Sequence, residues 1–255
     1  MNIQAVLFDM GGTIEDIRHD RALRLAALPG IISILGRAGI VLPGSDEEIL
    51  SKILRRNAEY KAWSESALVE SPPEVIWRDW NLKDFALPAG AVEKMADDLA
   101  HAWETTFFER KIRPDAKATL EALKTRGYRM GVISNTSSRT QVFTTLDEYG
   151  IADFFECVIL SSIEGVRKPH TALFTSALEA MKLPALAAAY VGDTLSRDVI
   201  GSKRAGFALA FRIDSFMTAA SDTAVAPGAE KPDFVVSSLG EIVGILDEME
   251  RRPVS

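Results

Sequence analysis

The stretch Ala5-Val-Leu-Phe-Asp9-Met-Gly11-Gly12-Thr13 decides how this chain folds. A short apolar run that ends in a carboxylate and two glycines is typical of a buried strand, which delivers Asp9 to its carboxyl end. Open α/β sheets keep their reactive groups at that edge. Two consecutive glycines let the backbone bend sharply and approach a ligand with no Cβ in the way. An ionised carboxylate beside such a bend can act as a nucleophile, for example toward phosphorus, provided that a cation offsets the repulsion between the two anions.

Length, charge and cysteine content limit the class of protein. The chain has 255 residues, 47% of them hydrophobic, which is enough for one large domain or two modest ones. Its net charge of −7 provides no basic field, so we expect neither nucleic acid nor an anionic membrane as a partner. No apolar run approaches the roughly 18 residues that span a bilayer, and no charged leader precedes the first strand. With Cys157 as its single cysteine the chain has no internal disulfide, and we expect a cytoplasmic protein.

After residue 113 the sequence alternates between strand and helix patterns. Such alternation predicts an α/β fold, a doubly wound parallel sheet. The expected helices begin near Pro114 and Pro169, and the segment 217–231, rich in Ala, Ser, Thr and Pro, is expected to be a surface loop. The expected strands cover 128–133, 157–160, 188–191, 207–213 and 233–236, and the other expected helices cover 141–149, 197–205 and 239–251.

The region 16–113 has a different character. It contains helical patterns and no alternating β-branched run, so we expect a small helical domain there. All four tryptophans fall in this region, and we expect them to pack in its core. The chain is thus predicted to consist of a core formed by residues 1–15 and 114–255, with a helical cap of residues 16–113 inserted after the first strand. The expected cap helices cover 22–28, 31–36, 47–63, 73–80 and 92–108.

Four strand ends of the predicted sheet finish in polar side chains. Because the carboxyl ends of parallel strands share one edge, residues far apart in sequence should converge there on one pocket. This convergence is the main functional signal in the sequence. The strand-end residues are Asp9, Ser134-Asn135, Arg167-Lys168-Pro169, and Asp193 with Asp198.

These motifs, in this order and at these separations, resemble the motif series of the haloacid dehalogenase superfamily. The resemblance covers residues 1–15 and about 110–245, and the helical insert matches the type of cap that the family places between its first and second motifs. It implies a Rossmann-like core and a hydrolase. The motifs are Asp9-Met-Gly-Gly-Thr13, Ser134-Asn135, Lys168-Pro169 and Gly192-Asp193-Thr-Leu-Ser-Arg-Asp198.

The resemblance implies a nucleophile and a metal site. Asp9 would take up the phosphoryl group of a small phosphorylated substrate as an aspartyl phosphate. Mg²⁺, a hard cation that prefers oxygen ligands, would be held by Asp9, the backbone carbonyl of Gly11 and Asp193. Asp198 would bind the metal directly or through water.

The resemblance also implies a phosphate-binding set. Lys168 would offset the carboxylates and help to hold Asp9 and the phosphate in place. Ser134, with the backbone amides of Gly12 and Asn135, would donate hydrogen bonds to phosphate oxygens. Thr13 would help to shape the first loop.

The chain departs from this pattern at Gly11. Phosphatases of the superfamily usually carry a second aspartate there, which protonates the leaving oxygen and later activates water. A glycine keeps the backbone carbonyl but cannot move a proton. General acid–base help is worth roughly 10²- to 10⁴-fold in rate, or about 3 to 5.5 kcal/mol. A sugar phosphate would suffer the whole deficit, whereas an acyl phosphate, whose leaving group needs no proton, would suffer little.

Three hypotheses remain open. The first is a Mg²⁺-dependent phosphatase. The second is a phosphonate hydrolase. Enzymes of that branch of the family have a small residue at this position and a cap lysine that forms a Schiff base. Lys52 and Lys61 are the candidate lysines, although an ordinary surface lysine is the favoured interpretation of both. The third is a nearly inert protein that binds phosphate ligands. A dehalogenase fits less well, because Asp193 and Asp198 suit a cation that carbon–halogen displacement in that branch does not need.

Three arginines near the start of the predicted cap complete the candidates. Arg18, Arg21 and Arg24 could meet an anionic substrate, but a solvated helix face is the favoured interpretation. The histidines show no ligand spacing and are expected to be structural or surface residues; they are His19, His101 and His170.

Overall fold

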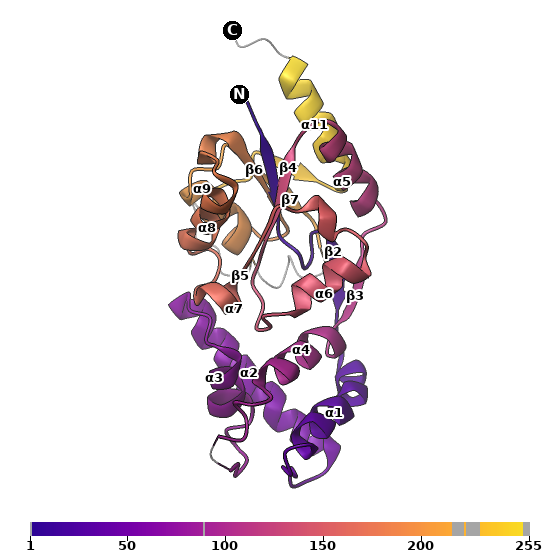
Figure 1. Cartoon of the computed structure of the whole chain (residues 1–255), viewed down its shortest axis with the longest axis vertical. Coiled ribbons are helices and arrows are strands. Elements are labelled where there is room, and N and C mark those ends of the chain that lie inside the picture. The colour runs from indigo at the N-terminus through magenta and orange to yellow at the C-terminus, as the bar shows by residue number, and fades with distance from the viewer. Residues whose placement is uncertain (1, 89, 216–221, 223–229, 252–255) are drawn as a thin grey trace.

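The core is a parallel sheet with the first strand in the middle. The computed structural model describes residues 2–88, 90–215, 222 and 230–251, so most of the expected loop 217–231 lies outside the described residues. Within them the main sheet has the order β5-β4-β1-β6-β7-β8, and every neighbouring pair is parallel. This confirms the predicted α/β class (Figure 1). The strands are β1 (Ala5–Phe8), β4 (Arg129–Ser134), β5 (Cys157–Leu160), β6 (Ala188–Gly192), β7 (Leu209–Ile213) and β8 (Phe234–Val236).

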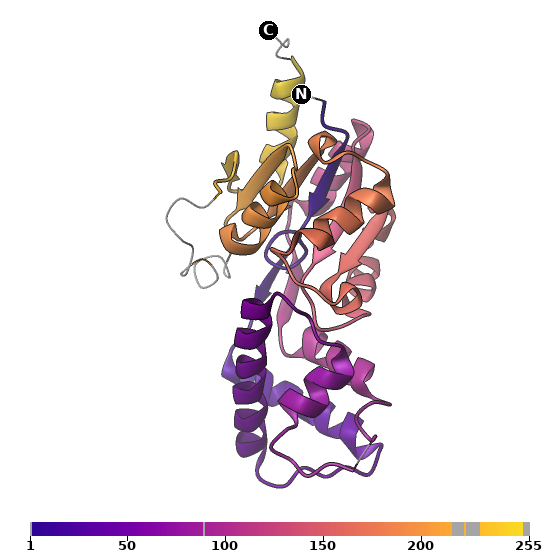
Figure 2. The ribbon, with the colours of Figure 1, turned by 90° about the vertical axis from the view of Figure 1, so that its left-hand side faces the viewer.

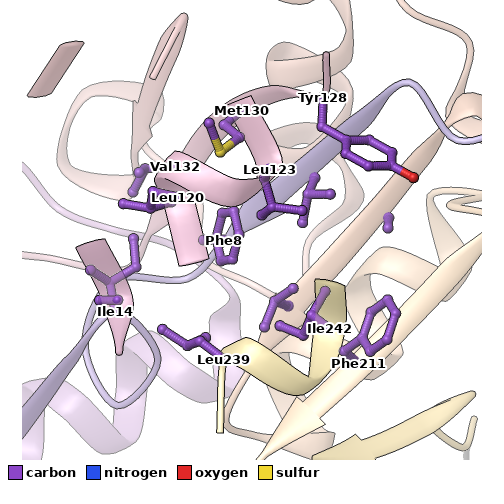
Figure 3. Packing of buried hydrophobic residues seen from close by; sticks show 14 of the residues in the cluster. Phe8, Ile14, Leu120, Leu123, Tyr128, Met130, Val132, Phe211, Leu239 and Ile242 are labelled. Atoms are coloured by element: carbon purple, nitrogen blue, oxygen red, sulfur yellow. The ribbon is translucent and has the colours of Figure 1, made fainter. Parts of the chain in front are cut away.

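Helices cover both faces of the sheet, which is why β1 is apolar at every position. Val6 and Phe8 face one layer, whereas Ala5 and Leu7 face the other, because successive side chains of a strand point to opposite sides. Figure 3 shows Phe8 packed among residues of the first layer. That layer contains α5 (Ala116–Thr125), α6 (Gln141–Glu148) and α11 (Gly240–Arg251), and the second contains α8 (Thr171–Met181) and α9 (Ile200–Arg204). Short helices lie between these elements: α7 (Ser161–Glu164), η2 (Ala152–Phe154), η3 (Ala185–Ala187) and η4 (Leu195–Val199).

A block of helices lies beyond the carboxyl edge of the sheet (Figures 1 and 2). It has a hydrophobic cluster of its own, separate from the two clusters of the core. Its longest helix, α2, begins with a capping box in which the Ser45 and Glu48 side chains each bind the other's backbone. No helix among the described residues combines the length and apolarity needed to cross a bilayer. The block comprises α1 (Arg21–Gly36), α2 (Asp46–Ala67), α3 (Pro73–Val75), η1 (Ile76–Asn81) and α4 (Ala96–Thr106).

Three predictions about this block were wrong in detail. The separate helices expected at 22–28 and 31–36 form the single helix α1, which continues through Pro29. The helix expected at 73–80 divides into one α-helical turn and the wider helix η1. Trp77 and Trp103 are buried as expected, but Trp63 is 41% exposed and stacks on Trp80 at the surface, with ring centroids 5.4 Å apart.

Two short strands connect the helical block to the core. Strands β2 (Glu15–Arg18) and β3 (Glu109–Ile112) pair antiparallel, so that the chain leaves and re-enters the core side by side. A helical domain was expected in 16–113, and these two strands at its ends were not foreseen. Both strands are rich in charged residues, as suits a partly exposed ribbon, and such a pattern does not stand out as β structure. The division of the chain at residues 15 and 113 stays a prediction.

Candidate active site

Asp9 lies at the carboxyl end of β1, at the start of a tight turn. Its backbone amide donates to the Val191 carbonyl at 2.8 Å, which fixes it against β6. Gly12 has a φ of +91°, and a Cβ on it would lie 2.4 Å from Oδ2 of Asp193. Only glycine therefore permits this turn to approach the neighbouring carboxylate so closely.

Three buried carboxylates meet beside this turn. Asp9, Asp193 and Asp198 each offer an oxygen within 4.8 Å of the others. Asp198 packs against the strand because residue 192 is a glycine, whose Cβ would otherwise lie 2.3 Å from it. Burial, together with the charge of Asp198, raises the pKa of Asp9 to about 6, and burial with the charges of both other acids raises the pKa of Asp193 to about 7.

Lys168 is the cation inside this cluster. Its ammonium donates to Oδ1 of Asp9 at 2.6 Å and to Oδ1 of Asp198 at 2.7 Å, and its side chain is only 2% exposed. Burial alone would raise the pKa of Asp198, but the charges of Lys168 and Arg197 hold it below its ordinary value. The Tyr190 hydroxyl accepts from Lys168 at 3.0 Å and donates to Asp198 at 3.2 Å, a supporting role that the sequence did not suggest.

The donor set fits a hard divalent cation. It consists of the carboxylate oxygens of Asp9, Asp193 and Asp198 and contains no sulfur or imidazole. Burial is the main cause of the raised pKa values of Asp9 and Asp193, and repulsion between the carboxylates adds to it. Asp9, Asp193 and Asp198 could therefore hold a hard divalent cation.

Besides Lys168, two of the predicted phosphate-binding residues line the cavity, whereas Gly12 and Thr13 do not. Ser134 and Asn135 line the same cavity as Asp9, and the Asn135 side chain fixes Lys168 by accepting from its amide at 2.9 Å. The expectation for the Gly12 amide was wrong, since that amide donates to the Glu15 carbonyl at 2.7 Å within the turn. Thr13 is fully buried and does not line the cavity, in keeping with a part in shaping the loop.

The space beside Gly11 is filled by an apolar side chain. A Cβ on Gly11 would lie 2.3 Å from Cδ1 of Ile17 and 3.5 Å from its Cγ1. Ile17 comes from β2, the strand that leads into the helical block. The position from which an acidic side chain at residue 11 would grow is therefore occupied by a methyl group, which can neither give nor take a proton.

The cavity lies between the edge of the sheet and the helical block. It has a volume of about 170 Å³, and both parts of the chain line it. Cations outnumber acids on its walls, which favours an anionic ligand. The charged lining residues are Lys61, Arg110, Arg167, Lys168 and Arg197 against Asp9 and Glu104. In the sequence, Arg167 was noted at a strand end and Arg197 within the last motif, but neither was assigned a role.

Glu70 fastens the helical block to the core beside the cavity. Its carboxylate is buried and accepts hydrogen bonds from Tyr60 Oη at 2.5 Å and from Ser161 Oγ at 2.8 Å. It also forms an ion pair with Arg167, and its amide donates to the Gly165 carbonyl at 3.0 Å. The segment that precedes Lys168 is thereby held to the end of α2.

Glu104 and Glu15 hold a second contact between the two parts. Glu104 accepts from Ser137 Oγ at 2.8 Å and from Arg110 at 2.9 Å. Arg110 also donates to Oε1 of Glu15 at 2.5 Å, whose Oε2 accepts from Tyr149 at 2.8 Å. Both oxygens of each acid are therefore engaged as acceptors. Glu15 begins the connection to the helical block, as expected, but it is fully buried there.

The two candidate cap lysines lie in different places. Lys61 lines the cavity, and its side chain is half exposed. Partial burial lowers its pKa most, and the charges of Arg197 and Arg167 lower it further. The Glu65 carboxylate, 3.8 Å away, opposes this shift. Its interpretation as an ordinary surface lysine was incomplete. Lys52 lies over the Phe85 ring at 5.2 Å, away from the cavity. The arginines Arg18, Arg21 and Arg24 are not among the cavity-lining residues.

Comparisons with known proteins agree with this geometry. A family model described as "haloacid dehalogenase-like hydrolase" matches residues 3–206. A glyceraldehyde 3-phosphate phosphatase of Pyrococcus abyssi is 30% identical over 80% of this chain and 79% of its own. A phosphoglycolate phosphatase of Vibrio parahaemolyticus is 26% identical over 96% of each chain. The crystal structure of a HAD phosphatase from Thermococcus onnurineus superimposes with a TM-score of 0.58 and 26% identity, covering 96% of this chain and 98% of that one.

Proposed function

We propose that this chain, which belongs to the haloacid dehalogenase-like hydrolase family, is a Mg²⁺-dependent phosphatase. It would hydrolyse a small phosphorylated metabolite through an aspartyl phosphate on Asp9. The observation that carries this proposal is the Lys168 ammonium between Asp9 and Asp198, with Asp193 within reach of the same point. The relatives' names, which are those of phosphatases, support a phosphorylated substrate.

Each residue has a part in the proposed reaction. Lys168 binds Oδ1 of Asp9 and so orients the carboxylate for attack on phosphorus. The bond between Asp9 and phosphorus forms while the bond from phosphorus to the leaving oxygen breaks, and Ser134 and the Asn135 amide donate to phosphate oxygens. Bound Mg²⁺ supplies the positive charge that lets two anions approach. Water then attacks the phosphorus of the aspartyl phosphate, releasing phosphate and restoring Asp9.

A trapping experiment tests this function. Acetyl phosphate should transfer one phosphoryl group to the protein in the presence of Mg²⁺, and chelation of the metal should abolish the transfer. Mass spectrometry after borohydride reduction should locate the phosphoryl group on Asp9. Tight binding of inorganic phosphate without any covalent transfer would instead favour the hypothesis of a protein that only binds phosphate ligands.

A phosphonate hydrolase is the second candidate, because Lys61 lines the cavity and has a lowered pKa. An amine in that place could form a Schiff base with an aldehyde-bearing phosphonate. Borohydride added during incubation with phosphonoacetaldehyde should then attach the substrate to Lys61 in the wild type and in a Lys52→Met control, but not in Lys61→Met. Absence of labelling in the wild type would reject this candidate.

A further inference from the structure

The side of the cavity next to Gly11 offers no proton to a departing group. The Ile17 methyl group occupies the place where an acid at residue 11 would begin, and the nearest carboxylate oxygen, Oε1 of Glu15, is 4.0 Å from that point. Glu15 is fully buried and does not line the cavity. A leaving group that must be protonated therefore finds no partner here.

The carboxylate of Glu104 and the hydroxyl of Tyr60, which also line the cavity, are already engaged. Glu104 uses both carboxylate oxygens as acceptors toward Ser137 and Arg110. The Tyr60 hydroxyl donates to Glu70 and accepts from the Ser71 amide at 3.0 Å. Among the cavity-lining residues in the described parts of the chain there is no histidine.

The cavity is nevertheless well suited to receive a negative charge. Lys61 on α2, in the helical block, and Arg197 on η4, in the core, both line the cavity. Burial is the main cause that lowers the pKa of Lys61, and repulsion by the charges of Arg197 and Arg167 lowers it further. An anion placed between these cations would relieve that repulsion.

We propose that the substrate is an acyl phosphate, the mixed anhydride of phosphoric acid and a small carboxylic acid, whose carboxylate leaves as an anion beside Lys61. This inference rests on the proposed function and names its substrate class. The Asp9 carboxylate forms a bond to phosphorus, and the bond from phosphorus to the acyl oxygen breaks. The electron pair stays on the released carboxylate, so the step consumes no proton. Water then hydrolyses the aspartyl phosphate to phosphate and Asp9, and one proton passes to solvent.

The test measures how fast Asp9 becomes phosphorylated, because every substrate yields the same aspartyl phosphate afterwards. A series of ring-substituted phenyl phosphates keeps the shape of the leaving group and changes its pKa. We expect the phosphorylation rate to rise by at least about 10²-fold from the poorest to the best leaving group, because no acid levels the series. Acetyl phosphate, whose leaving group has a pKa of roughly 4 rather than roughly 10, should be faster still.

Lys61→Met separates an anion-binding lysine from a proton donor. We expect it to slow phosphorylation by acetyl phosphate about 10-fold, the scale of one hydrogen bond to a charged group. Lys52→Met on the same helix should leave the rate within twofold. A rate that varies less than tenfold across the series, or a larger loss for phenyl phosphate than for acetyl phosphate in Lys61→Met, would overturn the inference while leaving the proposed function intact. Absence of phosphorylation by acetyl phosphate would reject both.

Discussion

Replacing Asp9 by Asn is expected to reduce turnover of acetyl phosphate by 10⁴-fold or more, on the order of what enzymes lose with their nucleophile. The amide has almost the shape of the carboxylate but cannot attack phosphorus. Lys168 keeps its bond to Asp198 and its contacts with the Ile133 carbonyl and Tyr190, so the surrounding structure should persist. Steady-state kinetics at saturating Mg²⁺, with phosphate release as the readout, measures the effect.

Stability measurements separate this loss from unfolding. The raised pKa of Asp9 means that its ionised form is disfavoured in the folded protein, so ionisation costs stability above the pKa of the unfolded chain. A neutral Asn removes that cost, and the melting temperature of the metal-free variant should therefore not fall. Asp153→Asn, a change at an exposed position in η2, is the matched control and should retain full activity. Turnover in Asp9→Asn within tenfold of the wild type would exclude Asp9 as the nucleophile.

The core was predictable because its signals are local. The apolar run of β1 and its terminal Asp9 mark a strand that is buried on both faces, and β5 was predicted with its observed bounds. The convergence of Asp9, Lys168 and Asp193 followed from topology, because parallel strands share one edge. Each of these predictions needed only the period of the pattern and the position of a polar residue at its end.

The cap side of the cavity could not be predicted in the same way. The contact of Ile17 with Gly11 depends on how the ribbon of β2 and β3 turns back over the nucleophile loop. The ion pair of Glu70 with Arg167 joins residues far apart in sequence, and neither residue belongs to a pattern that suggests the other. The bond from the Gly12 amide to the Glu15 carbonyl is a feature of this particular turn. Because the sequence does not reveal that bond, the amide was assigned to phosphate.

Residue 11 lacks an acidic side chain, and Ile17 also occupies the space that such a side chain would need. An aspartate at position 11 would have to displace the Cδ1 methyl group, whereas the Cγ1 atom at 3.5 Å would be in ordinary contact. Valine at position 17 removes Cδ1 and keeps the rest of the side chain. An Ile to Val change of this kind typically costs only about 0.5 to 1.5 kcal/mol of stability.

The double variant Gly11→Asp with Ile17→Val is therefore expected to restore a proton donor. Hydrolysis of an alkyl phosphate such as glycerol phosphate should rise by roughly 10²- to 10⁴-fold over the wild type, the usual value of general acid–base catalysis. The formation of the aspartyl phosphate from acetyl phosphate should change little, because that leaving group needs no proton. Rapid-quench measurement of Asp9 phosphorylation with both substrates gives the two rates.

The two single variants divide the effect into its parts. Ile17→Val alone opens the space without adding an acid and should leave the alkyl phosphate rate unchanged. Gly11→Asp alone adds the acid against the Cδ1 methyl group, so its gain should be smaller than that of the double variant, and the two changes should be strongly non-additive. If the double variant folds, binds Mg²⁺ and still hydrolyses glycerol phosphate no faster than the wild type, a missing proton is not what limits this enzyme on phosphate esters.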